Sequence, residues 1–175
     1  MGAELKQKPV KLFASIIFKD EEALKNTERK LEKKYGKMEP VVWRGSFDFT
    51  DYYYPEFGRP LQRKLICFKK TIDPADACNV KRVTNRIEDR TRINEKRNVN
   101  VDPGYVTEAK MVLLTTKDYS HRIYVGKGIF VEATLFYQDG SFRSWPWTYP
   151  DYASTELISY FNKVRELYRK VRQGG

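Results

Sequence analysis

Four residues of the types that carry out acid–base and phosphoryl chemistry lie between positions 102 and 132, namely Asp102, Lys117, His121 and Glu132. The run Asp102-Pro103-Gly104-Tyr105 predicts a turn, and we expect this turn to stand close to Lys117 and His121. A carboxylate, an ammonium group and an imidazole in one pocket can transfer protons and stabilise a phosphoryl group. These four are therefore the candidate catalytic residues of an enzyme that acts on a phosphoester or a related substrate.

The same part of the chain mixes cations with aromatic rings. Aromatic side chains stack nucleobases at about 1–3 kcal/mol per base, and cations neutralise phosphates. The candidates for phosphate contacts are Lys117, Arg122 and Arg143, and the candidates for stacking are Tyr124, Phe130 and Trp145. The alternative is that the C-terminal helix covers this surface and that Arg122 and Glu132 form a structural ion pair.

Two predicted β-hairpins position these side chains. The first turns at Gly126-Lys127-Gly128, a three-residue loop that pairs Val125 with Ile129, Tyr124 with Phe130, Ile123 with Val131 and Arg122 with Glu132. The second turns at Asp139-Gly140 and pairs Tyr137 with Phe142, Phe136 with Arg143 and Thr134 with Trp145.

Alternation along these strands predicts one apolar face and one mixed face. The apolar face carries Ile123, Val125, Ile129, Val131, Ala133, Leu135, Tyr137 and Phe142. His121 falls on this face beside Ala133, which favours a structural histidine over a catalytic one. The mixed face carries Arg122, Tyr124, Phe130, Glu132, Thr134, Phe136, Arg143 and Trp145.

The rest of the chain predicts a single α+β domain over residues 9–172, after a flexible tail at 1–8. Strands are expected at 10–18, 41–49, 63–70 and 98–102, with helices that begin at the caps Asp20 and Asp73. Their order, β-α-β-β-α-β, is that of a ferredoxin-like unit. The two hairpins extend its antiparallel-rich sheet, and a C-terminal helix begins at Asp151 or Ser154. Residues 107–117 suit either a strand or a short helix.

Composition narrows the functional classes. The chain has 33 Lys+Arg against 23 Asp+Glu, a net charge of +10, which favours anionic partners such as a nucleotide or RNA. The alternative is a charge-rich, solvated surface. Cys67, Cys78 and His121 are too few for a usual zinc site, so no metal is expected. Neither a membrane span nor a signal peptide is present, so we expect a cytoplasmic protein without a membrane partner. The sequence specifies no cofactor and no oligomeric state.

Several longer segments resemble a known family. They are FDFTDYYYPEFGRPLQR, KRVTNRIE, NVDPGYVTEAKMVLLTTKDYSHRIYVGKGIFVEATL and WTYPDY. Together they are similar to a bacterial family that is catalogued as a domain of unknown function (4416), over roughly residues 9–170. Its members often carry an automatic "GTP-binding protein" label, which implies nucleotide binding, although no G-x-x-x-x-G-K-[ST] phosphate loop is present in this chain. The polar positions that match are Glu56, Thr84, Asn85, Glu88, Asp102, Tyr105, Lys110, Lys117, His121, Arg122 and Glu132.

Three functional hypotheses follow. The first is a binding module for a phosphorylated ligand, either a nucleotide or RNA. Its ligand-binding residues would be Glu56, Asn85, Tyr105, Lys110, Arg122, Tyr124, Arg143 and Trp145. The second is the phosphoester enzyme described above, and the third is a protein-interaction subunit. The tyrosine-rich segment at residues 47–58 suits either a pocket wall or a well-anchored loop.

Overall fold

Strand β1 (Val10–Phe18) lies at the centre of an antiparallel sheet in the computed structural model, which describes residues 7–173. Within these residues the sheet has eight strands, in the order β2 (Trp43–Ser46), β3 (Gln62–Ile72), β1, β4 (Val99–Val106), β5 (Lys110–Thr115), β7 (Ile129–Gln138) and β6 (Ile123–Gly126). Strand β8 (Ser141–Ser144) pairs with β7. The tail predicted for residues 1–8 lies outside the described residues over positions 1–6.

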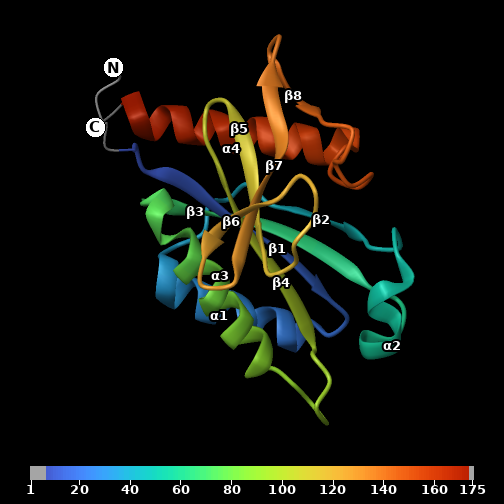
Figure 1. Cartoon of the computed structure of the whole chain (residues 1–175). Helices are drawn as coiled ribbons and strands as arrows, with labels where there is room; N and C mark the ends of the chain where they lie inside the picture. Colours follow the sequence, from blue (N-terminus) through green and yellow to red (C-terminus); the bar gives the residue numbers. More distant parts are fainter. Residues whose placement is uncertain (1–6, 174–175) are drawn as a thin grey trace.

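The first four strands confirm the ferredoxin-like prediction. Their spatial order is β2-β3-β1-β4, and every pair is antiparallel. The two hairpins extend this half through β5 and β7, so the chain is a single α+β domain (Figure 1). The segment at 107–117, which had two interpretations, contains strand β5.

Helices cover both faces of the sheet. On one face, α1 (Glu21–Tyr35) and α3 (Ala77–Asp89) pack with alternate residues of β1 such as Leu12 and Ile16. On the other, α4 (Thr155–Gln173) packs with Phe13, and Figure 1 shows α4 crossing the sheet away from α1 and α3. A third, smaller cluster lies under the segment that carries α2 (Tyr54–Phe57). None of the helices in the described residues is long and apolar enough to cross a membrane.

The predicted helix caps are confirmed in two cases and shifted in the third. Asp20 accepts a hydrogen bond from the amide of Ala23, and Ser154 accepts one from Leu157, which fixes the start of α4. Asp73 caps a 3₁₀ turn (Pro74–Asp76) that leads into α3.

Two features of the hairpins differ from the prediction. Gly126, not Val125, stands opposite Ile129, so Lys127 and Gly128 form a two-residue turn with positive φ at both positions. Strand β7 also has one extra residue opposite Met111 and Val112, at Thr134. The other predicted pairs of β6 with β7 and of β7 with β8 are present, except that no backbone pairing joins Arg122 to Glu132 or Thr134 to Trp145.

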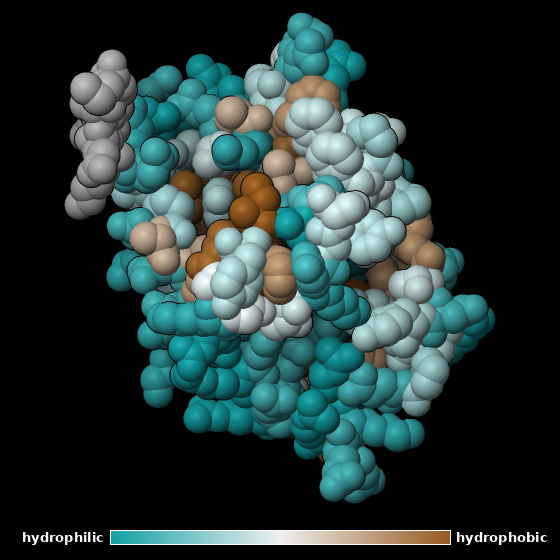
Figure 2. Space-filling model, viewed as in Figure 1, coloured by the Kyte–Doolittle hydropathy of each residue, from teal (hydrophilic) through white to brown (hydrophobic). Residues whose placement is uncertain are grey.

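The extra residue at Thr134 invalidates the prediction of one uniform apolar face. A bulge reverses which face the following residues point to. Val131 therefore packs against the α1–α3 core, whereas Leu135 and Phe142 pack against α4 on the other side, the face where Glu132 lies. Ile123 and Val125 do not join a core. They are exposed on the edge hairpin, where Figure 2 shows an apolar patch on an otherwise mainly hydrophilic face.

The run from Asp102 to Tyr105 is not a turn but part of β4. Pro103 stands opposite Ala14 in β1, and Gly104 stands opposite both Phe13 and Leu113. A Cβ atom on Gly104 would lie 2.3 Å from the carbonyl oxygen of Val112 and 2.4 Å from the ring of Phe13. Glycine is needed here because the neighbouring strand and ring approach the backbone too closely for any side chain.

Candidate functional site

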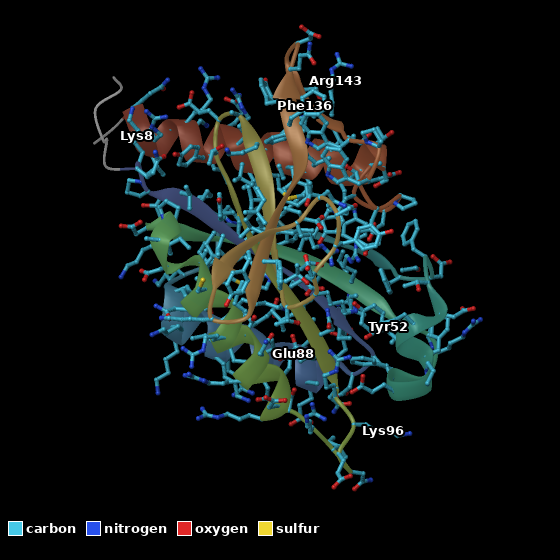
Figure 3. The ribbon with its side chains drawn as sticks, in the orientation of Figure 1. Lys8, Tyr52, Glu88, Lys96, Phe136 and Arg143 are labelled. Carbon is cyan, nitrogen blue, oxygen red and sulfur yellow. The ribbon has the colours of Figure 1, made fainter. Side chains whose placement is uncertain are left out.

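A cleft of about 590 Å³ opens where strands β4 and β5 separate. The two strands pair only from Gly104 to Val106, so the first half of β4 has no strand partner on this side. Figure 2 shows a hollow on this face beside the position that Figure 3 gives to Tyr52. The walls come from the loop before α2, from α3, from β4 and β5, and from the segment before α4.

Two charged side chains of α3 take the place of the missing strand partner. Lys81 Nζ donates to the carbonyl oxygen of Val101 at 3.1 Å, and Glu88 Oε1 accepts from the amide of Val101 at 2.9 Å. Lys81 and Glu88 are both buried. Their burial is explained by the backbone groups they satisfy, since an unpaired amide or carbonyl inside a protein is costly.

Asp102 projects into the cleft at the end of this pair. Its Oδ1 contacts Lys81 Nζ at 3.1 Å, and its Oδ2 accepts from Asn100 Nδ2 at 2.6 Å. Burial by itself raises the pKa of Asp102, but the ammonium of Lys81, together with its hydrogen bond and that of Asn100, outweighs burial and lowers the pKa. Asp102 is therefore an ionised carboxylate on the cleft wall.

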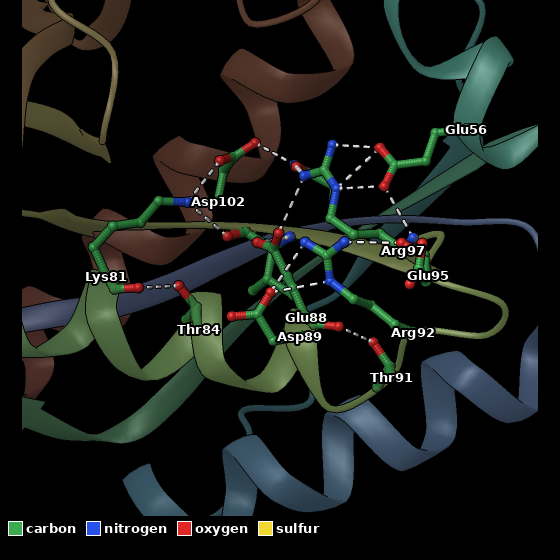
Figure 4. Close-up of polar contacts among 12 residues, drawn as sticks. Glu56, Lys81, Thr84, Glu88, Asp89, Thr91, Arg92, Glu95, Arg97 and Asp102 are labelled. Atoms are coloured by element: carbon green, nitrogen blue, oxygen red, sulfur yellow. Dashed lines mark hydrogen bonds and ion pairs between the residues drawn. The ribbon is translucent and has the colours of Figure 1, made fainter.

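Arg97 joins this group to the segment that carries α2, as Figure 4 shows. Its guanidinium donates to both carboxylate oxygens of Glu56, to Oε2 at 2.7 Å and to Oε1 at 3.0 Å, and it also donates to Glu88 at 3.2 Å and to Asn100 at 3.0 Å. The hydrogen bond from Arg97 lowers the pKa of Glu56. Burial is the main cause that raises the pKa of Glu88, with Asp102 adding to it and Lys81 opposing it.

On the α4 side, Arg63 and Asp151 form an ion pair in which each side chain is 7% exposed. The guanidinium of Arg63 also lies over the rings of Phe47, at 4.4 Å, and Tyr152, at 5.1 Å. Its Nε has no hydrogen-bond partner in residues 7–173. Arg63 therefore lines the cleft as one half of a buried ion pair that holds the segment before α4 against β3.

Arg122 and Glu132 form the predicted ion pair, with Arg122 Nε 2.7 Å from Glu132 Oε2. Glu132 also accepts from Thr134 Oγ1 at 2.9 Å and lies 3.1 Å from His121 Nε2. The guanidinium of Arg122 donates to the backbone oxygen of Lys117 at 3.1 Å. Glu132 thus positions Arg122, and Arg122 in turn fixes the loop that carries Lys117.

Aromatic side chains form the mouth of the cleft. Phe49, Tyr52, Tyr53 and Tyr149 line it. Lys117 Nζ lies 4.1 Å from the centre of the Tyr52 ring and forms no ion pair within residues 7–173. Burial raises the pKa of Tyr53, so its hydroxyl stays a neutral donor.

The model of a family described as a domain of unknown function (DUF4416) matches residues 8–168. The chain belongs to this family. This confirms the resemblance found in the sequence, and comparisons with curated proteins and with solved structures find no match. The DUF4416 family description assigns no function, so the residues of the cleft itself carry the functional argument.

The cleft brings together part of the predicted site. Asp102, Lys117, Arg122, Glu132 and Asn85 all line it, and Glu56 is one contact away through Arg97. His121 does not line it. Its ring stacks on Trp147, with centroids 5.6 Å apart, and contacts Glu132, so its predicted place on the apolar face beside Ala133 is wrong.

The other predicted ligand-binding residues lie elsewhere. Tyr105 packs against the α1–α3 core, and Lys110 is exposed at the start of β5. Tyr124 packs on Phe130 at the edge hairpin, whereas Trp145 packs on Phe136 near β8. Figure 3 shows Phe136 and Arg143 well apart from Tyr52 and Glu88. The predicted stacking residues Tyr124, Phe130 and Trp145 are therefore not gathered at the cleft, since the bulge at Thr134 separates the Tyr124–Phe130 pair from the Phe136–Trp145 pair.

Sequence reasoning missed four cations that line the cleft, namely Arg63, Lys81, Arg92 and Arg97, and two of them, Arg63 and Lys81, left a signal. Arg63 lies on the same face of β3 as Leu65 and Cys67, because every second residue of a strand points to the same side. The sequence therefore places a charge at a position expected to be buried. Lys81 lies four residues after Ala77, inside the apolar stripe of α3 and not on a solvated face. Arg97, in the loop before β4, left no signal. Among residues 7–173, no three His, Cys, Asp or Glu side chains gather as a metal site.

Proposed function

We propose that this protein binds a small phosphorylated ligand in the cleft between β4 and β5, with a mononucleotide as the best fit. The observation that carries the proposal is Lys117. Its ammonium group stands over the Tyr52 ring at the mouth of the cleft and has no carboxylate partner within residues 7–173. A cation and an aromatic ring side by side are the two groups that a nucleoside phosphate uses, one for the phosphate and one for the base.

The other cations of the cleft are paired within the protein and have a structural role. Lys81, Arg97 and Arg122 are each engaged by carboxylates of the protein. Such pairs hold the walls in place before a ligand arrives, so little ordering free energy is lost on binding. Arg63 is likewise paired, with Asp151, so Lys117 supplies the charge that the ligand neutralises.

Size and shape favour a small ligand over RNA. A volume of about 590 Å³ lies within the range of small-molecule sites, roughly 300–1,000 Å³. The aromatic residues predicted as an RNA platform are split between the edge hairpin and the region of β8. A strand of RNA would need a continuous row of stacking rings, whereas a mononucleotide needs one.

Titration calorimetry with the mono-, di- and triphosphates of adenosine, guanosine, cytidine and uridine tests the proposal. We expect at least one to bind, with an affinity that falls as salt is raised because the phosphate contact is ionic. Lys117→Ala should weaken binding at least about fivefold, the effect of losing roughly 1 kcal/mol. Lys25→Ala, which removes an exposed lysine of α1, is the matched control. Failure of all twelve nucleotides to bind, or equal affinity for Lys117→Ala and wild type, would overturn the proposal.

A further inference from the structure

The carboxylate of Asp102 retains unused acceptor capacity inside the cleft. Two oxygens of an ionised carboxylate accept about four hydrogen bonds, and those of Asp102 have one contact each, from Lys81 and Asn100. The side chain is 36% exposed although its neighbours are largely buried, and it lines the cleft. A ligand in the cleft therefore meets an anionic acceptor.

This acceptor restricts which part of a ligand lies beside it. A phosphate placed against an ionised carboxylate is repelled, so the phosphate belongs at Lys117, whose charge is not neutralised. The group beside Asp102 must then be a neutral donor. Adjacent hydroxyls of a sugar are such donors, and two of them match the two oxygens of one carboxylate.

Asn85, on α3, adds a second polar group to the lining of the cleft. It follows Lys81 by one turn of α3, lines the cleft and forms no side-chain hydrogen bond within residues 7–173. An amide both donates and accepts, and a sugar hydroxyl does the same. The Asp102 carboxylate accepts from a hydroxyl, and the Asn85 amide can either donate to a hydroxyl or accept from one.

We propose that the cleft selects ligands with a ribose-like pair of hydroxyls, which Asp102 and Asn85 bind while Lys117 meets the phosphate. This inference rests on the proposed function and narrows it to ribonucleotides and sugar phosphates over their deoxy counterparts. The polar contacts between protein and sugar, not the base, would then supply the selectivity.

The test compares matched pairs of ligands on the full chain by calorimetry. The pairs are each of the twelve ribonucleotides named above with its 2′-deoxy form, and ribose 5-phosphate with 2-deoxyribose 5-phosphate. We expect the loss of one hydroxyl to weaken binding about tenfold or more, as a hydrogen bond to a charged acceptor does. Equal affinity within every pair would overturn this inference and leave the proposed function standing. Absence of binding by both members of every pair would instead overturn the proposed function.

Two variants assign the effect to its residues. Asp102→Asn should reduce the ribo-to-deoxy ratio towards one, and Asn85→Ala should reduce it in part while leaving the fold intact, since Asn85 forms no side-chain hydrogen bond within the described part of the chain. Asp139→Asn is the matched control, because it removes one carboxylate in a distant turn that asparagine tolerates. A ratio that stays at the wild-type value in Asn85→Ala and in folded Asp102→Asn would overturn the assignment to this wall.

Discussion

Lys81 and Glu88, two turns apart on α3, bind the carbonyl and the amide of the same residue, Val101. Together they complete the unpaired edge of β4 and so keep the cleft open between β4 and β5. These two side chains bind the backbone groups that a neighbouring strand would otherwise bind. The proposed ligand site depends on this replacement, because the cleft occupies the place of that strand.

Removal of Glu88 should therefore destabilise the fold. Glu88→Ala leaves the Val101 amide and part of the Arg97 guanidinium without a partner, and we expect a loss of about 3 kcal/mol in the free energy of unfolding by urea. Glu88→Gln keeps an oxygen acceptor for Val101 and should lose less. Asp89→Ala, the next residue, removes only an exposed pair with Arg92 and should cost about 0.5 kcal/mol or less. Equal losses for Glu88→Ala and Asp89→Ala would contradict the bridging role.

The pKa of Asp102 should depend on Lys81. We expect the carboxyl carbon of Asp102 to titrate below its ordinary value of 3.8, followed by nuclear magnetic resonance. Lys81→Met removes the ammonium and leaves burial, so the pKa should rise. Because the pKa is lower in the folded state, the stability from Asp102 is present above the unfolded pKa and is lost as the pH falls through the folded one. An Asp102 pKa that does not change in Lys81→Met would show that the ammonium is not the cause.

Gly104 should tolerate no side chain. Gly104→Ala would place a Cβ atom against the backbone of Val112 and the ring of Phe13, and we expect a loss of about 3 kcal/mol or failure to fold. Gly45→Ala, in edge strand β2, meets only the far end of the Trp43 ring, which can move. Thermal unfolding should show a clearly smaller loss for Gly45→Ala, and a loss equal to that of Gly104→Ala would be the contrary result.

Tyr52 should contribute to binding only when the ligand carries a base. Tyr52→Ala should lower the affinity for a nucleoside monophosphate by about 1–3 kcal/mol, the range of one base–ring stack, and should change the affinity for ribose 5-phosphate little. Tyr119→Ala, an exposed tyrosine outside the cleft lining, serves as the control in calorimetry. A uniform loss for both ligands would mean that Tyr52 shapes the cleft and does not stack on the base.

His121 should behave as a structural residue. His121→Ala removes a partner of Glu132 and the ring that stacks on Trp147, so we expect the free energy of unfolding to fall by about 1–2 kcal/mol. The sequence also suggested a catalytic histidine. Hydrolysis of a phosphoester by the wild type that disappears in His121→Ala, with the melting temperature unchanged, would favour that enzyme instead.

The sequence by itself determined the local elements of this fold. The cap residues Asp20 and Ser154 and the turn Asp139-Gly140 act through bonds and dihedral angles within a few residues, so their effects can be read from neighbouring positions. The strand order of the first half followed from the succession of these elements. The pair of Arg122 with Glu132 was also predicted from hairpin register, although the turn that joins the strands has two residues and not three.

Only the tertiary structure decided which charges face the cleft. The spacing of Lys81 places it in the apolar stripe of α3, but nothing in the sequence near Lys81 or Glu88 shows what their charges would bind. Their partner is a backbone edge on a strand further along the chain. The bulge at Thr134 likewise reversed the faces of β7, an event that alternation of residue types does not reveal. The burial of Lys81 and Glu88 depends on where β4 and β5 separate, and the bulge depends on how β7 pairs with β5. Both are set by pairing between strands that are distant in the sequence, so no local pattern of residues reveals them.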